Sequence, residues 1–259
     1  SSLFYYNCIG VGLSIGTTSL MANAIGEKKD DKASYFLAQS ISLSVFVSVI
    51  VTLVGINFGP KIILLMNDSY ETMLLSMDYL NIIFLGSVFV FIQMAVNSSL
   101  SAMGDTKSSR NVLIFSFFLN IVLNPLFIFG YGPIPAMGMK GIAISTIISQ
   151  AVGTAYIIFK VSKTDLSKYL YLSCFKPKIE ILIELIKQAV PAAIGMMMIS
   201  VGVFIILFFI SQYGDLALAG YGTAIRYEQL YLLPVLGLNA AVLSMVAQNF
   251  GAKKIERVN

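Results

Sequence analysis

Long stretches without a charged residue are the feature that most limits what this chain can fold into. A membrane-spanning helix needs about 20 consecutive, mostly apolar residues. The uncharged stretches cover residues 1–26, 33–60, 79–104, 111–139, 141–159, 188–214 and 229–252. The turn-rich run from Gly130 to Pro135 is expected to end one helix near Gly130 and to let the next start near Gly138. The sequence therefore predicts an all-α membrane protein, a polytopic transmembrane helix bundle with seven spans.

The basic residues are distributed between the expected loops in a way that predicts an orientation. If the first span ends in the cytoplasm at Glu27, the cytoplasmic loops are residues 27–32, 105–110, 160–187 and 252–259. These loops hold 14 of the 17 Lys and Arg residues, whereas only Lys61 and Lys140 fall outside, and Arg226 lies within a span. Because cytoplasmic loops carry an excess of Lys and Arg, this division predicts that the C-terminal end of the chain is cytoplasmic.

Two segments between the spans are not expected to cross the membrane. Residues 61–77 mix charged and apolar side chains, which predicts a short interfacial helix on the outer face. Residues 163–187 predict a cytoplasmic linker, in which Pro177 precedes an amphipathic piece from Ile179 to Lys187. The linker divides the chain into a first lobe, residues 1–162, and the start of a second lobe, residues 188–259.

The chain also contains an internal repeat. A shift of 225 residues aligns Gly12-Leu13 with Gly237-Leu238 and Gly26 with Gly251, and seven of 18 aligned positions are identical. The simpler explanation is that any inward-running helix can end in a glycine followed by lysines. The repeat interpretation predicts two parallel halves related by an axis along the membrane normal, as in secondary transporters. On that interpretation the chain is a fragment, helices 2 to 8 of an expected twelve in two parallel six-helix repeats.

Several enzyme classes are disfavoured by the residue types present. The chain has no histidine, the commonest general base and metal ligand, and Cys8 and Cys174 form neither a disulfide framework nor a metal spacing. The serine-hydrolase pattern from Gly12 to Gly16 lacks its strand and its histidine, so these glycines are expected to form a helix-packing face. We expect no catalytic residue, no metal site, no cofactor and no nucleic-acid partner. A seven-helix receptor fits the number of spans but not the repeat.

An ordered set of motifs resembles one known family of transporters. The motifs are Ser101-Ala102-Met103-Gly104-Asp105-Thr106-Lys107, Asn120-Ile121-Val122-Leu123-Asn124-Pro125, Phe127-Ile128-Phe129-Gly130, Gly141-Ile142-Ala143 with Ser149-Gln150, and Gln248-Asn249-Phe250-Gly251-Ala252. Together they are similar to the multidrug and toxic compound extrusion (MATE) transporters over the whole chain.

The resemblance implies a two-lobed secondary transporter in the cell membrane, monomeric and surrounded by lipid. Such a protein exports amphiphilic or cationic drugs and toxic compounds by alternating access, coupled to the inward flow of sodium ions or protons. The alternative is a lipid-linked oligosaccharide or polysaccharide flippase of the same superfamily. A flippase should have a larger cationic cavity for phosphates, and Arg226 is the only cation within a span.

The resemblance also points to candidate ion-binding residues in the first lobe. One branch of the family commonly carries an asparagine in its fifth helix and, four residues later, an acid before a proline; here these positions are Asn120 and Asn124. Asparagine cannot titrate, so Asn124 is expected to coordinate an ion or bind substrate rather than relay a proton. Ser145, Thr146 and Gln150 on the sixth helix are expected to complete this site, and interhelical hydrogen bonding is the competing role of the asparagines. A second branch has a glutamate after the proline of its seventh helix, but residues 192–206 contain no acid.

Further candidates lie in the last two expected helices. Arg226 and Glu228 are charged residues within a span, and such residues are candidates for a functional role. They are two residues apart, so they do not face each other on a helix. Their alternative position is the outer membrane interface. Met196, Met197 and Met198 are candidates for a flexible substrate cavity, with ordinary core packing as the other interpretation. Pro191, Gly222 and Pro234 are candidate hinges.

Overall fold

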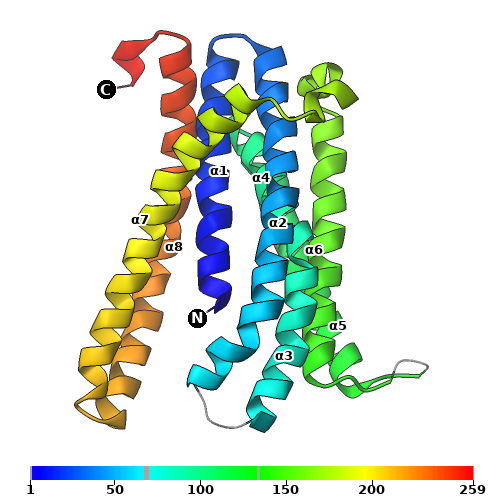
Figure 1. Cartoon of the computed structure of the whole chain (residues 1–259). Helices are drawn as coiled ribbons and strands as arrows, with labels where there is room; N and C mark the ends of the chain where they lie inside the picture. The colour runs from blue at the N-terminus through cyan, green and yellow to red at the C-terminus, as the bar shows by residue number, and fades with distance from the viewer. Residues whose placement is uncertain (1, 67–69, 133–134, 259) are drawn as a thin grey trace.

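The computed structural model describes residues 2–66, 70–132 and 135–258, with the side chains of residues 2–7, 62–66, 70–75 and 215 left out. The chain forms a bundle of long helices (Figure 1). They are α1 (Ser2–Gly26), α2 (Asp30–Met66), α3 (Tyr70–Leu85), α4 (Ser87–Ala102), α5 (Thr106–Phe129), α6 (Met139–Ser162), α7 (Ile179–Ser211) and α8 (Asp215–Gly251). Three short 3₁₀ helices, η1 (Asp165–Tyr169), η2 (Leu172–Phe175) and η3 (Ile255–Arg257), join or follow them.

The seven spans predicted from the sequence are confirmed by the length and composition of these helices. Six of them are long and apolar enough to cross a membrane, namely α1, α2, α5, α6, α7 and α8. The number is seven when the pair formed by Ser76–Leu85 of α3 and by α4, which is bent by 46° at Gly86, is counted as one span. The expected break between α5 and α6 is also present, since α5 ends at Phe129 and α6 begins at Met139.

The prediction of a separate interfacial helix over residues 61–77 is wrong. Helix α2 continues through Pro60 to Met66, and α3 is already helical from Tyr70. Residues 62–66 are all apolar in the sequence, so nothing in the composition ends the helix at residue 60. In the same way, the amphipathic piece from Ile179 to Lys187 is not a separate element, because it forms the first turns of α7.

The connections between helices alternate between the two ends of the bundle (Figure 1). The α1–α2 connection, the end of α6 and the C-terminal η3 lie at one end, and the α5–α6 and α7–α8 connections lie at the other. The end of α4 lies beside the end of α8, because Gln248 Nε2 donates a hydrogen bond to the Ala102 carbonyl oxygen over 2.5 Å. The loops that hold 14 of the basic residues therefore share one end, which we call the basic end.

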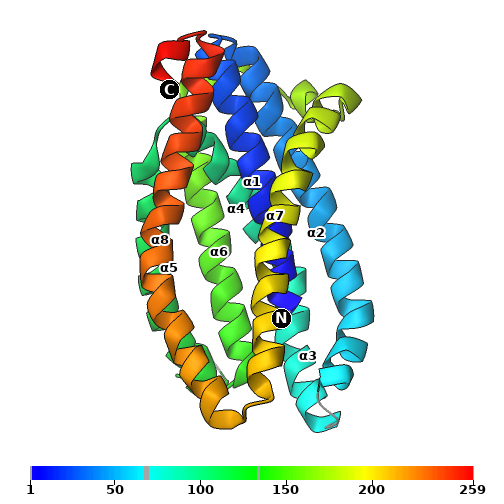
Figure 2. The ribbon, with the colours of Figure 1, turned by 90° about the vertical axis from the view of Figure 1, so that its left-hand side faces the viewer.

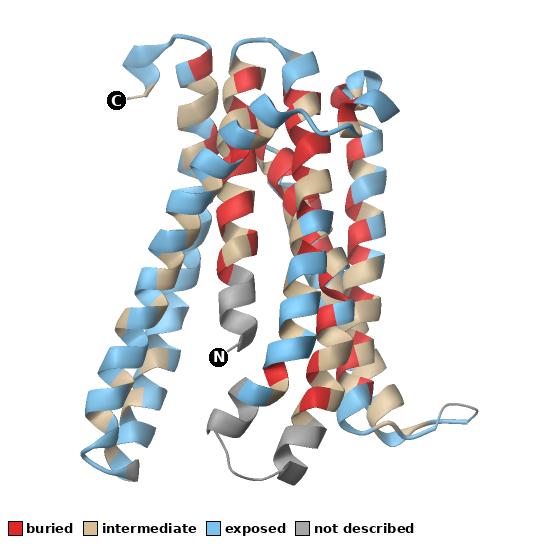
Figure 3. Cartoon of the chain, in the orientation of Figure 1, coloured by how far each residue is buried: buried red, intermediate tan, exposed pale blue. Residues whose placement is uncertain are grey.

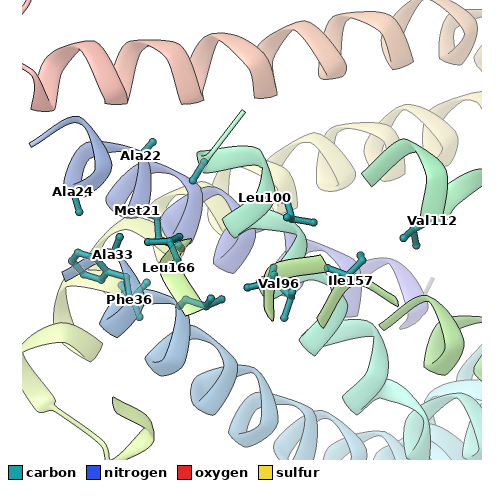
Figure 4. Close-up of a cluster of buried hydrophobic side chains, with 14 residues drawn as sticks. Met21, Ala22, Ala24, Ala33, Phe36, Val96, Leu100, Val112, Ile157 and Leu166 are labelled. Carbon is teal, nitrogen blue, oxygen red and sulfur yellow. The ribbon is translucent and has the colours of Figure 1, made fainter. Parts of the chain in front are cut away.

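Helix α1 lies inside the bundle and contacts α2, α4, α7 and α8. Around it gathers a core of buried apolar side chains that includes Met21, Phe36, Leu100 and Ile157 (Figure 4). Burial is concentrated in the half of the bundle near α1, α2, α4 and α6, whereas α7 and α8 are largely exposed along their length away from the basic end (Figure 3). In a membrane the exposed apolar side chains contact lipid tails, which are as apolar as the core.

Hydroxyl groups join the helices of this core. Ser14 and Thr17 of α1 share hydrogen bonds with Ser98 of α4 and Ser40 of α2, over oxygen–oxygen distances of 2.7 Å and 2.6 Å. Thr154 of α6 donates to the Phe89 carbonyl oxygen over 2.9 Å. Since lipid offers these groups no other partner, each such bond satisfies a polar group within the bundle.

The predicted packing face of α1 is confirmed by its contact with α7. A Cβ atom at Gly12 would lie 2.6 Å from the carbonyl oxygen of Ala189 and 2.7 Å from the Cβ atom of Ala193. Gly16, one turn later, lies against the backbone of Leu185 and Ala189. Among the described residues no helix pair packs more extensively than α1 and α7. Small residues at four-residue spacing on both helices allow this close approach.

The segment between α6 and α7 is fastened to α2 by a buried glutamine. Gln39 is fully buried, and its Nε2 atom donates to the carbonyl oxygens of Cys174 and Lys176 over 2.6 Å and 2.7 Å. Its Oε1 atom accepts a hydrogen bond from the Lys178 backbone N–H over 3.1 Å. Ser34 also donates to the Leu166 carbonyl oxygen over 2.9 Å. Residues 165–178 thus lie against α2.

Asp105 caps α5 at the basic end. Its carboxylate accepts hydrogen bonds from the Ser108 backbone N–H over 3.0 Å and from the Ser108 hydroxyl over 2.6 Å. Such a bond satisfies one of the free N–H groups at a helix N-terminus. Donation by the Ser108 hydroxyl and backbone lowers the pKa of Asp105 below its usual value, so the cap is present at neutral pH and is lost as pH falls through that lowered pKa.

Candidate functional site

Polar side chains in the membrane-spanning part come together where α5 packs against α6. The Ser145 hydroxyl of α6 donates a hydrogen bond to Asn124 Oδ1 of α5. One turn earlier on α5, Asn120 Nδ2 donates to the Ser116 carbonyl oxygen of its own helix over 3.2 Å. Both asparagines are partly buried and Ser145 is buried. The structure thus joins Asn124 to α6, and the hydrogen bond of Asn120 among the described residues uses its side-chain nitrogen as donor.

The α5–α6 turn sets the register of this contact. The Met137 N–H donates to the Phe127 carbonyl oxygen over 2.9 Å, and the Gly138 N–H donates to the Ile128 carbonyl oxygen. These bonds join the last turn of α5 to the residues just before α6, so the two helices run antiparallel. Pro125 has no backbone N–H, so the carbonyl oxygen of Ile121 loses its donor within the helix.

Thr146 and Gln150, the other two predicted members, lie on α6 one turn apart and are partly buried. The Thr146 hydroxyl donates to the Ile142 carbonyl oxygen over 2.9 Å, which leaves its lone pairs free to accept or coordinate. Among the hydrogen bonds of the described residues, none joins either side chain to Asn120 or Asn124. Their part in the site remains a prediction.

Two polar residues that the sequence interpretation left out belong to the same helix contact. Ser116 lies one turn before Asn120, and its hydroxyl is buried without a hydrogen-bond partner among the described residues. Gln93 of α4 has a buried Oε1 atom that is equally without a hydrogen-bond partner within the described part. Both side chains lie against Gly153 of α6. The spacing Ser116, Asn120, Asn124 places the three α5 residues on one face, and that pattern is visible in the sequence.

This arrangement offers oxygen ligands and hydrogen-bonding groups but no acid. Hydroxyl, amide and carbonyl oxygens are suited to a hard cation such as sodium or to the polar groups of a drug. The α5 and α6 candidates include no titratable side chain, so they cannot bind a proton themselves. No group of three or more His, Cys, Asp or Glu side chains that could hold a metal ion occurs in the described ranges.

Arg226 and Glu228 lie apart from this contact. Both are on α8, where their side chains are exposed, and α8 contacts neither α5 nor α6 within the described part of the chain. Figure 2, viewed from the side on which α7 and α8 lie, shows α8 running along the near face of the bundle. The structure therefore divides the predicted site into an α5–α6 group and an α8 group.

The remaining candidates lie on the two last long helices. Met196 and Met197 are partly buried in α7 and Met198 is exposed. Pro191 lies within α7, and Gly222 and Pro234 lie within α8. Both helices are continuous through these positions. A Cβ atom at Gly222 would have no neighbour within 4 Å among the described atoms. Cavity and hinge roles for these residues remain predictions.

A bundle of seven candidate spans, with an uncharged polar contact between two of them, places the chain in the class of multi-pass membrane proteins. The family itself follows from comparison with known proteins. The sequence model described as MatE matches residues 1–126 and 191–259, which is most of the chain. The chain belongs to the MatE family.

Curated relatives carry names that agree with this family. The chain is 33% identical over 258 residues to the Probable multidrug resistance protein YpnP of Bacillus subtilis, covering 96% of this chain and 54% of that protein. It is 27% identical over 248 residues to the Multidrug export protein MepA of Staphylococcus aureus, covering 95% and 54%. The chain spans about half the length of the curated relatives it matches. The flippase alternative gains no support from these names.

Solved structures share the fold. A MOP superfamily transporter from Pyrococcus furiosus, whose structure is described as having a binding pocket of reverse polarity, superposes with a TM-score of 0.89 at 24% identity. A multidrug resistance MATE family transporter in an outward-facing conformation superposes with a TM-score of 0.88 at 23% identity. Each match covers 99% of this chain and 56% of the other. These likenesses establish the arrangement of helices.

Proposed function

We propose that this chain is part of a cation-coupled antiporter that exports amphiphilic or cationic compounds by alternating access. The observation that carries the proposal is the oxygen-rich contact of Asn124 with Ser145 between two spans of a MatE-family bundle, with Asn120 one turn away on α5. The names of the multidrug relatives support the substrate class. Sodium fits the uncharged ligand set, whereas proton coupling needs an acid, for which Glu228 is the candidate within a span of this chain.

The proposal includes an orientation in the cell membrane. The basic end of the bundle faces the cytoplasm, because it holds the loops with 14 of the 17 basic residues. Lipid surrounds the exposed apolar faces of α5, α7 and α8, and the transporter acts as a monomer without a cofactor. The division into a first lobe, residues 1–162, a linker, residues 163–187, and a second lobe from residue 188 is part of the same proposal.

Substitution at the α5–α6 contact tests the site. In the complete gene product that contains residues 1–259, Asn124→Ala is expected to lower ethidium efflux from proteoliposomes by roughly tenfold, because one buried polar contact of about 1.4 kcal/mol is lost. Asn120→Ala and Glu228→Gln are expected to lower it in the same direction. Asn111→Ala is the matched control, since Asn111 is exposed near the basic end of α5 and away from the contact. Unchanged efflux in all three variants would remove the proposed sites.

A further inference from the structure

A groove lies between α5 and α6 in the half of the bundle near the basic end. Its volume is about 420 Å³, and its lining includes Val112, Phe115, Val152, Gly153 and Tyr156. Gly153 gives the groove depth, because a Cβ atom there would lie 3.2 Å from Val112 Cγ1. Phe115 and Val152 are exposed, one on each helix, whereas Val112 is buried. The groove is therefore open on its outer side, and its volume falls in the range of sites that hold small ligands.

Each of the two helices carries a lysine in line with its part of the groove. On α6, Val152, Tyr156 and Lys160 follow one another at four-residue spacing, which places them on one face of the helix. Lys160 Nζ lies 5.5 Å from the centroid of the Tyr156 ring. On α5, Lys107 precedes Phe115 by eight residues, which is about two turns. Since the two helices are antiparallel, both lysines lie where the groove reaches the basic end.

Positive charge exceeds negative charge at this end of the groove. The adjoining helix ends, residues 105–110 and 160–163, hold one acid and four basic residues, which are Lys107, Arg110, Lys160 and Lys163. The acid is Asp105, whose carboxylate already accepts two hydrogen bonds from Ser108. Within the described part of the chain, no salt bridge joins Lys107 or Lys160 to a carboxylate. Lys107 also lies in the first turn of α5, which contains no acid and where the helix dipole favours an anion.

We infer that this groove binds an anionic phospholipid, with an acyl chain against Phe115 and Val152 and the phosphate held by Lys107 and Lys160. The apolar lining suits an acyl chain, which a free phosphate ion lacks. Basic residues beside a gap between membrane helices favour an anionic headgroup over a zwitterionic one. The exposed apolar face of α5 contacts lipid in general, whereas this groove selects one class of lipid. The inference concerns binding alone and needs no transport activity.

Quenching of tryptophan fluorescence by brominated lipids tests the site. Residues 1–259 contain no tryptophan, so Phe115→Trp places a reporter in the groove of the complete gene product, in which any other tryptophan is replaced by phenylalanine. The protein is reconstituted in phosphatidylcholine nanodiscs that contain a minor fraction of phosphatidylglycerol or of phosphatidylcholine with dibrominated acyl chains. We expect the groove to prefer phosphatidylglycerol roughly fivefold or more.

Removal of the two lysines should abolish this preference. In the Phe115→Trp protein, Lys107→Gln with Lys160→Gln is expected to make quenching by the two brominated lipids equal. The matched control is Lys187→Gln with Arg257→Gln, which removes two positive charges from exposed positions of α7 and η3 near the basic end. The control should keep the preference, because these residues are not beside the groove.

The outcomes distinguish the lipid site from other occupants of the groove. A preference for phosphatidylglycerol that is lost in the lysine variant and kept in the control supports the site, whether or not a drug is transported. Equal quenching by both lipids in the Phe115→Trp protein shows unselective lipid contact and overturns the site. Quenching by neither lipid shows that protein covers the groove, and it overturns the site as well. So does an equal effect of the lysine variant and its control.

A second reporter covers the case in which Phe115→Trp does not fold. Val152→Trp places the tryptophan on the α6 side of the same groove, at another exposed position. The same preference for phosphatidylglycerol is expected there, and the same lysine variant should abolish it. A preference at Val152→Trp that survives the loss of both lysines overturns the site.

Discussion

Gln39→Met is expected to release the segment between α6 and α7 from α2. Gln39 is fully buried and makes three hydrogen bonds, to the carbonyl oxygens of Cys174 and Lys176 and from the Lys178 N–H. Methionine has a similar volume but offers none of these bonds, so three backbone groups lose their partner. At about 1 kcal/mol or more for each group, the free energy of unfolding falls by roughly 3 kcal/mol. Thermal denaturation in detergent measures the loss.

Trypsin cleavage gives a local readout of the same change. The released segment contains Lys168, Lys176 and Lys178, and cleavage there follows the population of the opened segment. We expect faster cleavage of Gln39→Met than of the unsubstituted protein. Gln212→Met, at an exposed position directly after α7, is the matched control and should change neither stability nor cleavage. Equal cleavage rates in Gln39→Met and in the control would show that Gln39 does not hold this segment.

Gly12→Ala is expected to separate α1 from α7. The added Cβ atom would lie 2.6 Å from the Ala189 carbonyl oxygen, and because that oxygen belongs to a helix backbone it cannot move aside alone. Overpacking of this kind costs about 1–3 kcal/mol, and it acts on the most extensive helix contact of the described chain. The measurement is the midpoint of thermal unfolding in detergent, which we expect to fall.

Gly195→Ala provides the control for this effect. Gly195 lies in α7, and a Cβ atom there would have no described neighbour within 4 Å. Since alanine has a higher helix propensity than glycine, Gly195→Ala should leave the midpoint unchanged or raise it. If Gly12→Ala is as stable as Gly195→Ala, the close approach of α1 and α7 is not a feature of the folded protein.

The spans could be predicted because lipid imposes a simple rule on composition. About 20 apolar residues form one helix, and the break at Gly130 and the start near Gly138 follow from turn residues. The small-residue face at Gly12 could be predicted for a similar reason, since glycine spacing in an apolar helix has few other uses. These features depend on residues that are close together in the sequence.

Features that depend on distant residues could not be predicted in the same way. The hydrogen bonds of Gln39 join positions 135 to 139 residues apart, and no local pattern indicates them. The extension of α2 past Pro60 was missed because the charged residues among the apolar ones in residues 61–77 were interpreted as a separate interfacial helix. At the candidate site, the sequence identified Asn120 and Asn124, but the contribution of Gln93 depends on how α4 meets α6 near Gly153.

Ethidium efflux with the sodium and proton gradients imposed separately tests the central proposal most directly. The complete gene product that contains residues 1–259 is reconstituted in proteoliposomes, so that each gradient can be applied or collapsed alone. We expect efflux to require one of the two gradients, with sodium favoured by the uncharged oxygens of Asn120, Asn124 and Ser145. Efflux that persists when both gradients are collapsed, or that never occurs, would contradict a cation-coupled drug exporter.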